Sequence, residues 1–201
     1  QKCLQIIEKH GFGLAIQTKS DMILRDLEIL KSINRKAKCV VQMTLTTFDD
    51  NLCRIIEPNV CPTSRRFQVI QKMKEEGIPV VVWLDPFLPY INDSFENFKS
   101  LLEFCVRVKV EGIICFGIGL TLRNGNREYF YEKLDRFFPG LKEKYIKEFG
   151  MNYEITSSNS KKIMEYFYKT CRENNILCGI EECFSFLNKF PEEQSGQLEL
   201  F

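Results

Sequence analysis

The sequence predicts an α/β fold: a partial (βα) barrel of the TIM type, made of parallel strands, with a helical C-terminal extension. Over the first 120 residues, four short apolar runs typical of strands alternate with amphipathic helical patterns. The third run, Ile78–Leu84, contains no polar residue, as expected of a parallel strand covered on both faces. After about residue 120, helical patterns follow one another. We therefore expect the C-terminal half of a barrel (1–120), a helical extension (121–190) and a polar tail (191–201).

The expected strands are separated by helical patterns with recognisable starts and stops. The strands are Phe12–Gln17, Cys39–Leu45, Ile78–Leu84 and Gly112–Gly117. The expected helix N-caps, whose side-chain oxygens accept bonds from free backbone N–H groups, are Ser20, Thr63 or Ser64, and Asp93-Ser94. The chain opens within a helical pattern that ends at His10-Gly11, because glycine commonly ends helices. A short helix around Leu52 is expected to end at Glu57-Pro58.

The C-terminal part is expected to be mostly helical. Two helices lie between residues 128 and 149 and are broken at Pro139-Gly140. Ser157–Ser160 supplies the cap of the next helix. The short apolar stretch Ile176–Ile180 is expected to add a strand. Four parallel units make only half a barrel, so the first strand is expected to be an open edge.

The composition excludes several classes of protein. The 201 residues carry 28 basic and 27 acidic side chains, and a net charge of +1 gives no general attraction for DNA. The single histidine, His10, cannot build a catalytic triad or a multi-histidine metal site from this chain alone. No apolar run approaches the roughly 18–20 residues of a membrane span. Nine scattered cysteines in a chain of this size indicate a reducing cytoplasm rather than a disulfide scaffold.

Polar residues gather where the expected strands end, which is where active sites form in parallel α/β folds. The segments are Thr18–Ser20, Thr44–Thr47, Asp85–Pro89 and Gly117–Arg123. Together they supply a cation, several hydroxyls, a carboxylate and flexible backbone. This mixture suits a polar cofactor that has a carboxylate and a ribose, although polar strand ends are common in barrels.

An ordered set of short segments is spread over roughly residues 5–185. The segments are Ile16–Asp21 with Ile23–Asp26, Leu45–Thr47, Ile56–Pro58, Arg65-Arg66, Glu76–Val80, Gly119–Arg123 and Asn126–Tyr131. This set resembles the spore photoproduct lyase-like family of radical S-adenosylmethionine proteins. The resemblance implies an enzyme that cleaves S-adenosylmethionine reductively with a 4Fe–4S cluster, forming a 5′-deoxyadenosyl radical.

The cysteine spacing departs from that family's pattern. The family holds its cluster on three cysteines spaced C-x3-C-x2-C near the start of the barrel. Here the cysteines stand at positions 3, 39, 53, 61, 105, 115, 171, 178 and 183, and none of them has this spacing. Thiolates are what hold such clusters. We therefore expect the chain to be a fragment, inactive by itself, whose missing N-terminal half of the barrel carries the cluster ligands.

The resemblance also assigns cofactor-binding residues. Lys19 matches a family lysine that faces the methionine carboxylate of the cofactor; the alternative is a solvated lysine before a helix. Thr44 matches a hydroxyl that contacts the cofactor, or is an ordinary β-branched strand residue. Asp85 stands where the family often has a small residue, and either binds a ribose hydroxyl or starts an Asp-Pro turn. Glu57-Pro58 is interpreted as a helix end.

Two further groups have alternative readings. Arg123 and Arg127 either reach a substrate phosphate or are ordinary exposed loop arginines. Cys171, Cys178 and Cys183 lie close in sequence, but their spacings are not those of a zinc finger and no fourth ligand is evident. We expect buried free thiols there and no metal site.

The last five residues, Gln197-Leu198-Glu199-Leu200-Phe201, resemble the pentapeptide by which bacterial DNA-repair and replication proteins dock on the sliding clamp. Gln197, Leu198, Leu200 and Phe201 would be the anchors, and a polar lead suits a peptide that inserts into a groove. The alternative is a chain end that straps down its own domain.

The sequence thus supports two functions. One is a fragment of a radical S-adenosylmethionine enzyme acting on an undetermined substrate, damaged DNA being one candidate. The other is a non-catalytic interaction module.

Overall fold

The computed structural model describes residues 1–190. Its centre is a four-stranded parallel sheet in the order β1-β2-β3-β4, which confirms the predicted α/β partial barrel. The strands are β1 (Leu14–Thr18), β2 (Cys39–Leu45), β3 (Val80–Leu84) and β4 (Gly112–Ile114). The expected range of β2 is confirmed, whereas the other three strands are shorter than expected. Within the described residues, β1 has one neighbouring strand and is an open edge.

Helices alternate with the strands of this sheet. They are α1 (Lys2–Lys9), the 3-10 helix η1 (Asp21–Asp26), α2 (Leu27–Lys36), α3 (Asp50–Ile56), α4 (Thr63–Glu75) and α5 (Phe95–Val108). The Ser20 hydroxyl accepts a bond from the backbone N–H of Met22, and the Ser94 hydroxyl accepts one from Asn97, so both expected caps are confirmed. The cap expected at Thr63 or Ser64 is wrong: α4 follows Pro62, and the Thr63 hydroxyl donates to the Thr47 carbonyl at 2.6 Å.

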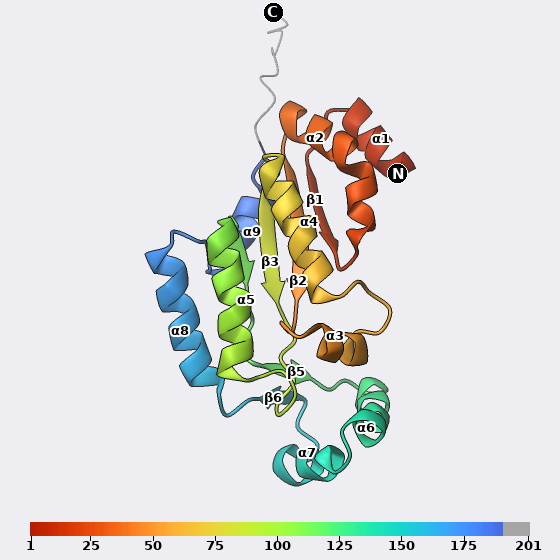
Figure 1. The fold of residues 1–201 in the computed structure, drawn as a ribbon, viewed down its shortest axis with the longest axis vertical. Helices are drawn as coiled ribbons and strands as arrows, with labels where there is room; N and C mark the ends of the chain where they lie inside the picture. The colour runs from red at the N-terminus through yellow and green to blue at the C-terminus, as the bar shows by residue number, and fades with distance from the viewer. Residues whose placement is uncertain (191–201) are drawn as a thin grey trace, which may run out of the picture.

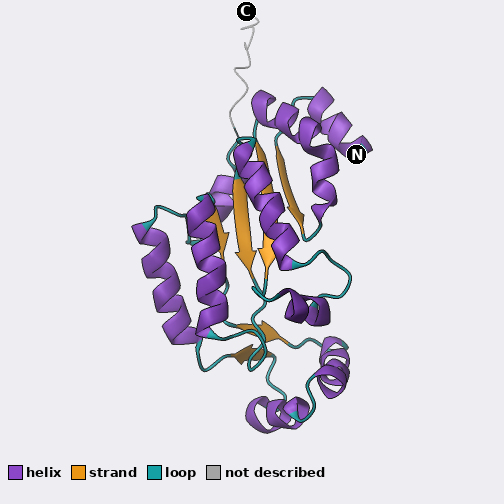
Figure 2. Ribbon diagram, in the orientation of Figure 1, coloured by secondary structure: helices purple, strands orange, loops and turns teal. Residues whose placement is uncertain are grey.

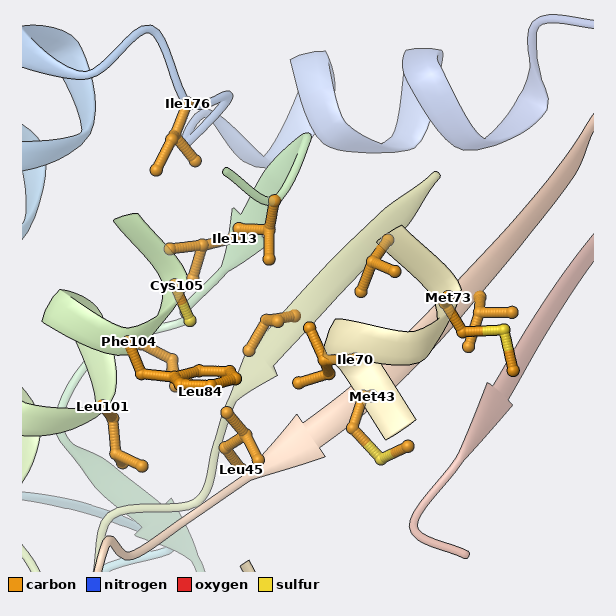
Figure 3. Close-up of a cluster of buried hydrophobic side chains, with 14 of the residues drawn as sticks. Met43, Leu45, Ile70, Met73, Leu84, Leu101, Phe104, Cys105, Ile113 and Ile176 are labelled. Carbon is orange, nitrogen blue, oxygen red and sulfur yellow. The ribbon is translucent and has the colours of Figure 1, made fainter. Parts of the chain in front are cut away.

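The sheet is covered on both faces. Figure 1 shows α4 and α5 across the near face and α9 behind the sheet. The near-face core contains buried side chains of β2, β3, α4 and α5, including Met43, Leu84, Ile70 and Phe104 (Figure 3). On the far face, Val40, Val81 and Ile114 pack against α9. Burial on both faces explains why the sequence of β3 is apolar throughout.

The segment after β4 leaves the sheet and returns to it. Strands β5 (Gly119–Thr121) and β6 (Glu154–Thr156) form an antiparallel pair, with α6 (Asn126–Phe137) and α7 (Leu141–Phe149) between them. The expected helix break at Pro139-Gly140 is confirmed. Leu122, Leu134, Tyr145 and Ile155 form a small separate core. Figure 2 shows the β5–β6 pair beyond the carboxyl ends of the central strands. We call residues 119–156 the β5–β6 module.

The last two described helices rejoin the main sheet. Helix α8 (Ser160–Glu173) lies beside α5, and α9 (Ile180–Asn188) packs against β4. The added strand expected at Ile176–Ile180 is wrong: one parallel bridge joins Leu177 to Gly112, and α9 begins at Ile180. The expected boundaries at residues 120 and 190 stay predictions. No helix among residues 1–190 has the length and apolar character needed to cross a membrane.

Candidate functional site

The carboxyl ends of the four parallel strands converge beside the β5–β6 module (Figure 2). Lys19 follows β1, Thr44 lies near the end of β2, and Asp85 directly follows β3. In a parallel sheet such residues meet at one edge. The structure therefore brings all three predicted cofactor-binding residues to this edge, while their binding roles stay predictions.

Lys19 is held by an ion-pair network at this edge. Its Nζ lies 2.6 Å from Oε1 of Glu57, whose side chain is 10% exposed. The other oxygen of Glu57 lies 2.9 Å from Nη1 of Arg66 and accepts a hydrogen bond from the Thr46 hydroxyl at 2.8 Å. Sequence reasoning missed Glu57 and Arg66 because Glu57-Pro58 looked like a helix end. A short network thus connects Lys19 to the interior.

Arg66 anchors this network. Its side chain is completely buried on α4, and it donates to the backbone carbonyls of Thr44 at 3.0 Å and Cys61 at 2.9 Å. Burial by itself would raise the pKa of Glu57, but hydrogen bonding to Lys19 and the charges of Arg66 and Lys19 hold that pKa below its usual range. Glu57 is therefore a carboxylate that bridges two cations.

The far face of the sheet is polar and aromatic near this edge. The Thr44 hydroxyl accepts a bond from Gln17 Nε2 at 3.4 Å, and Gln42 Oε1 accepts one from Trp83 Nε1 at 2.8 Å. The Trp83 ring lies 5.8 Å from the ring of Phe116, whose side chain is 55% exposed. Polar groups and an exposed ring beside the strand ends can contact a ligand that combines a planar ring with hydroxyls.

Asp85 lies at the boundary between this edge and the module. Its peptide bond to Pro86 is cis. Burial raises the pKa of Asp85, and the nearby charge of Lys19 partly opposes this effect. Asp85 and nine residues of the module line an open cavity of about 760 Å³.

The two predicted substrate-binding arginines differ in environment. Arg127 is buried, and its guanidinium donates to the carbonyls of Gly150 (3.1 Å), Met151 (3.2 Å) and Asn152 (2.6 Å). Arg123 is exposed in the loop before α6. Arg127 thus fixes the chain between α7 and β6, and a phosphate-binding role for either arginine stays a prediction.

The cysteines are free thiols within the described residues. Cys171 and Cys183 are buried, Cys178 is half-buried, and burial raises the pKa of each thiol. Between residues 1 and 190, no group of three or more His, Cys, Asp or Glu side chains has an arrangement that could hold a metal ion. The predicted docking residues Gln197, Leu198, Leu200 and Phe201 lie outside the described residues.

Comparison with known proteins identifies relatives in sequence. No family model matches this chain. It is 30% identical over 131 residues to the uncharacterized protein ORF301 of Acidianus two-tailed virus, covering 62% of this chain and 42% of the relative. It is 29% identical over 135 residues to the uncharacterized protein Rv2578c of Mycobacterium tuberculosis, covering 67% of this chain and 39% of the relative. The chain thus spans about two fifths of the length of these curated relatives.

One solved structure shares the fold of this chain, and a second is similar over part of it. A domain of pyruvate-formate lyase-activating enzyme from Bacteroides vulgatus superposes with a TM-score of 0.54 at 14% identity, covering 89% of this chain and 86% of that domain. SuiB of Streptococcus suis, solved with S-adenosylmethionine bound, gives a TM-score of 0.45 at 16% identity over 78% of this chain and 34% of SuiB. At the identity of the first match, the likeness shows a common fold.

Proposed function

We propose that this chain forms the C-terminal half of the barrel of a radical S-adenosylmethionine enzyme and contributes part of its cofactor site. The observation that carries the proposal is the convergence of Lys19, Thr44 and Asp85 at the carboxyl edge of a parallel sheet. The sheet belongs to a fold shared with a domain of pyruvate-formate lyase-activating enzyme. The ordered sequence segments that resemble radical S-adenosylmethionine proteins support the same reading.

The side chains at this edge match the chemistry of S-adenosylmethionine. The cofactor presents a carboxylate, an ammonium, ribose hydroxyls and a planar base. An ammonium has three N–H donors, and Glu57 accepts from Lys19, so Lys19 retains donors for a ligand carboxylate. The Asp85 carboxylate has no hydrogen-bond partner within residues 1–190 and can accept bonds from hydroxyls or an ammonium. The donor set therefore fits the cofactor's polar groups.

The same residues do not fit a 4Fe–4S cluster. Such a cluster needs thiolate ligands brought together, and the described cysteines form no such group. We assign the cluster ligands to other parts of the full-length protein, since this chain spans about two fifths of its relatives. The open edge of β1 offers backbone groups with which further strands can pair.

The proposed roles of the residues concern binding and orientation. Lys19, fixed by Glu57 and Arg66, neutralises the cofactor carboxylate. The Thr44 hydroxyl donates or accepts hydrogen bonds, and the Asp85 carboxylate accepts them, which orients the rest of the cofactor. When bound and reduced, the cofactor would supply a 5′-deoxyadenosyl radical. If the substrate is DNA, which is one candidate, Arg123 is the phosphate contact, because Arg127 is occupied by backbone carbonyls.

The decisive test uses the full-length product of the gene that encodes this chain. The protein is loaded anaerobically with iron and sulfide, reduced with dithionite and incubated with S-adenosylmethionine. We expect 5′-deoxyadenosine and methionine to form, and we expect Lys19→Ala to weaken cofactor binding in calorimetry at least tenfold. Lys99→Ala, at an exposed position of α5, is the matched control. A cluster-loaded protein that neither binds nor cleaves the cofactor would refute the proposal.

A second function rests on the last five residues alone. We infer from their sequence that they dock on a sliding clamp, which would raise the protein's effective concentration on DNA. This function needs no catalytic activity and is separable from the first by substitution of the tail.

A further inference from the structure

A cavity beside the candidate cofactor site has a distinctive lining. It has a volume of about 760 Å³ and lies between the loops that follow β3 and β4 and the β5–β6 module. This volume is within the usual range of small-molecule sites, which is about 300–1,000 Å³. Its polar side chains come from Asp85, Thr121, Asn126, Glu154, Thr156 and Ser160. Because these groups come from the loop after β3 and from β5, α6, β6 and α8, the cavity is a product of the fold rather than of one local cluster.

The lining contains two carboxylates and no basic side chain. Asp85 comes from the end of β3 and Glu154 from the first position of β6. Neither carboxylate has an ion-pair or hydrogen-bond partner within residues 1–190. The cavity lining therefore has an excess of negative charge, which no basic residue of the lining neutralises.

The nearest predicted cations offset this charge only in part, since Lys19 lies close enough to Asp85 to oppose the rise in its pKa. Lys19 pairs with Glu57 at 2.6 Å, Arg127 donates to three backbone carbonyls of the segment after α7, and Arg123 does not line the cavity. A phosphate or carboxylate group entering the cavity would meet like charges. An ammonium or guanidinium would instead supply the missing counter-charge.

The burial of Asp85 adds a reason for a cationic ligand. Removing a carboxylate from water without a partner is unfavourable, and this burial raises the pKa of Asp85. A cation close to Asp85 would stabilise its ionised form. The cavity lining also includes the apolar side chains of Phe116, Ile118, Leu122 and Phe130, so a ligand can bury a ring or an aliphatic stem there.

We infer that this cavity binds a compound, or a side chain of a larger substrate, that joins a positively charged amine or guanidine to an aromatic or apolar body. Asp85 and Glu154 contact the cation, and the Phe116 side of the cavity contacts the body. The inference rests on the proposed function in one respect: the cavity adjoins the candidate cofactor edge and is taken as its substrate site. The inference excludes a phosphodiester as the group that enters the cavity.

Three probes of nearly equal shape test the class of ligand. Tyramine is cationic, tyrosol is neutral and 4-hydroxyphenylacetate is anionic, and all three carry the same phenol ring. Each is titrated into the ¹⁵N-labelled 201-residue chain, with amide shifts followed by NMR. We expect tyramine to bind at least about tenfold more tightly than 4-hydroxyphenylacetate, with tyrosol between them. The reason is that tyramine and 4-hydroxyphenylacetate differ by two units of net charge. The shifts should appear at Gly119 and Asn126, which line the cavity.

Carboxylate substitutions link any preference to this cavity. Glu154→Gln and Asp85→Asn each preserve side-chain size, and each is expected to reduce the preference for tyramine about threefold to fivefold. Glu173→Gln, at the end of α8 and outside the cavity lining, is the matched control and should leave it unchanged. Equal binding of the three probes, tighter binding of the anion, or a preference unchanged in both cavity variants would overturn the inference.

This experiment is independent of the proposed radical chemistry. The titrations contain no S-adenosylmethionine, and Glu154 has no proposed contact with that cofactor. A chain that binds tyramine as expected but belongs to a protein that does not cleave the cofactor would refute only the proposed function. Cofactor cleavage together with loss of charge preference would refute only the assignment of the cavity.

Discussion

Replacing Glu57 by Gln should destabilise the protein more than any substitution of an exposed glutamate. Glu57 bridges Lys19 and Arg66, and the Arg66 side chain is completely buried. The substitution preserves size but removes the negative charge that compensates Arg66. It also brings amide N–H donors close to the N–H donors of Lys19 or Arg66, so at least one hydrogen bond is lost.

The magnitude follows from the burial of the partners. Breaking a buried ion pair by removing one partner costs about 3–5 kcal/mol, because an uncompensated charge is left behind. The amide oxygen of Gln can still accept one bond, so we expect a loss of about 3 kcal/mol in the free energy of unfolding. For a protein of this size, such a loss lowers Tm by roughly 6–12 °C. Lys19→Ala should cost only about 1 kcal/mol or less, because Lys19 is 38% exposed.

The pH dependence provides an internal check. The pKa of Glu57 is lowered in the folded protein, so its contribution is fully present above the unfolded pKa of about 4.3. That contribution is lost as the pH falls through the folded pKa, since the protonated carboxyl resembles the amide. The difference in stability between the wild type and Glu57→Gln should therefore be largest near pH 7 and shrink below about pH 4.

Urea denaturation followed by circular dichroism measures these differences. Glu103→Gln is the matched control, because Glu103 makes only an exposed pair with Lys99 at 3.6 Å on α5; it should change stability by less than about 0.5 kcal/mol. A loss of under about 1 kcal/mol for Glu57→Gln at pH 7, or a loss that does not vary with pH, would refute the view that Glu57 compensates Arg66.

Three further predictions concern other parts of the chain. Gly119→Ala should loosen the β5–β6 pair, because an added Cβ would lie 2.0 Å from a backbone oxygen of β6. We expect amide hydrogen exchange at residues 119–121 to become at least about tenfold faster, and unchanged exchange would contradict this prediction. Cys3 is exposed and should be alkylated within minutes at pH 8. Cys105 is buried, its pKa is raised to about 12, and it should react only when the protein unfolds. Equal alkylation rates of the two cysteines, measured by mass spectrometry, would contradict this difference. The double substitution Leu200→Ala/Phe201→Ala should abolish retention on immobilised sliding clamp, and equal retention would remove the docking hypothesis.

The central sheet was predictable because its strands are apolar and continuous. The run Cys39–Leu45 became β2 with the expected bounds, since all seven residues are buried and no turn residue interrupts them. Strands β5 and β6 were missed because each has three residues, too few to show a period of two. Their pairing joins Leu120 to Ile155, and the sequence between them consists of two helices. Nothing local in either segment indicates such a partner.

Helix α9 was missed for a different reason. Its buried residues Cys183 and Leu187 have helical spacing, which is a usable signal. The apolar stretch before it, Ile176–Ile180, was interpreted as a strand. That interpretation included Ile180, which is the first residue of the helix. Only the bridge between Leu177 and Gly112 remains of the expected strand. The helix is favoured because it covers the far face of the sheet at Val40 and Val81.

The site was predictable in its strand-end residues and unpredictable in the groups that hold them. Lys19, Thr44 and Asp85 were assigned from the family resemblance, and their meeting at one edge was expected because parallel strands end there. The sequence left Arg127 as a possible exposed loop arginine and assigned Arg66 no role, since charged side chains are rarely buried unless paired. The structure buries both by supplying partners: Glu57 and backbone carbonyls for Arg66, and three carbonyls after α7 for Arg127. Burial of a charged side chain depends on such partners. For neither arginine does the nearby sequence indicate the partner that allows its burial.

This pattern bears directly on the kind of ligand the molecule can accept. The sequence contains nearly equal numbers of acidic and basic residues, which suggests no preference. The fold, however, uses Arg66 and Arg127 to satisfy groups of the protein itself and pairs Lys19 with Glu57, while Asp85 and Glu154 line the cavity without an ion-pair partner among the described residues. The charge of a site therefore depends on which charged side chains are paired within the protein. A net charge near zero is compatible with a site that selects strongly between cationic and anionic ligands. Neutralising Glu154 should alter ligand preference while leaving the Glu57 network and its pH-dependent stability intact.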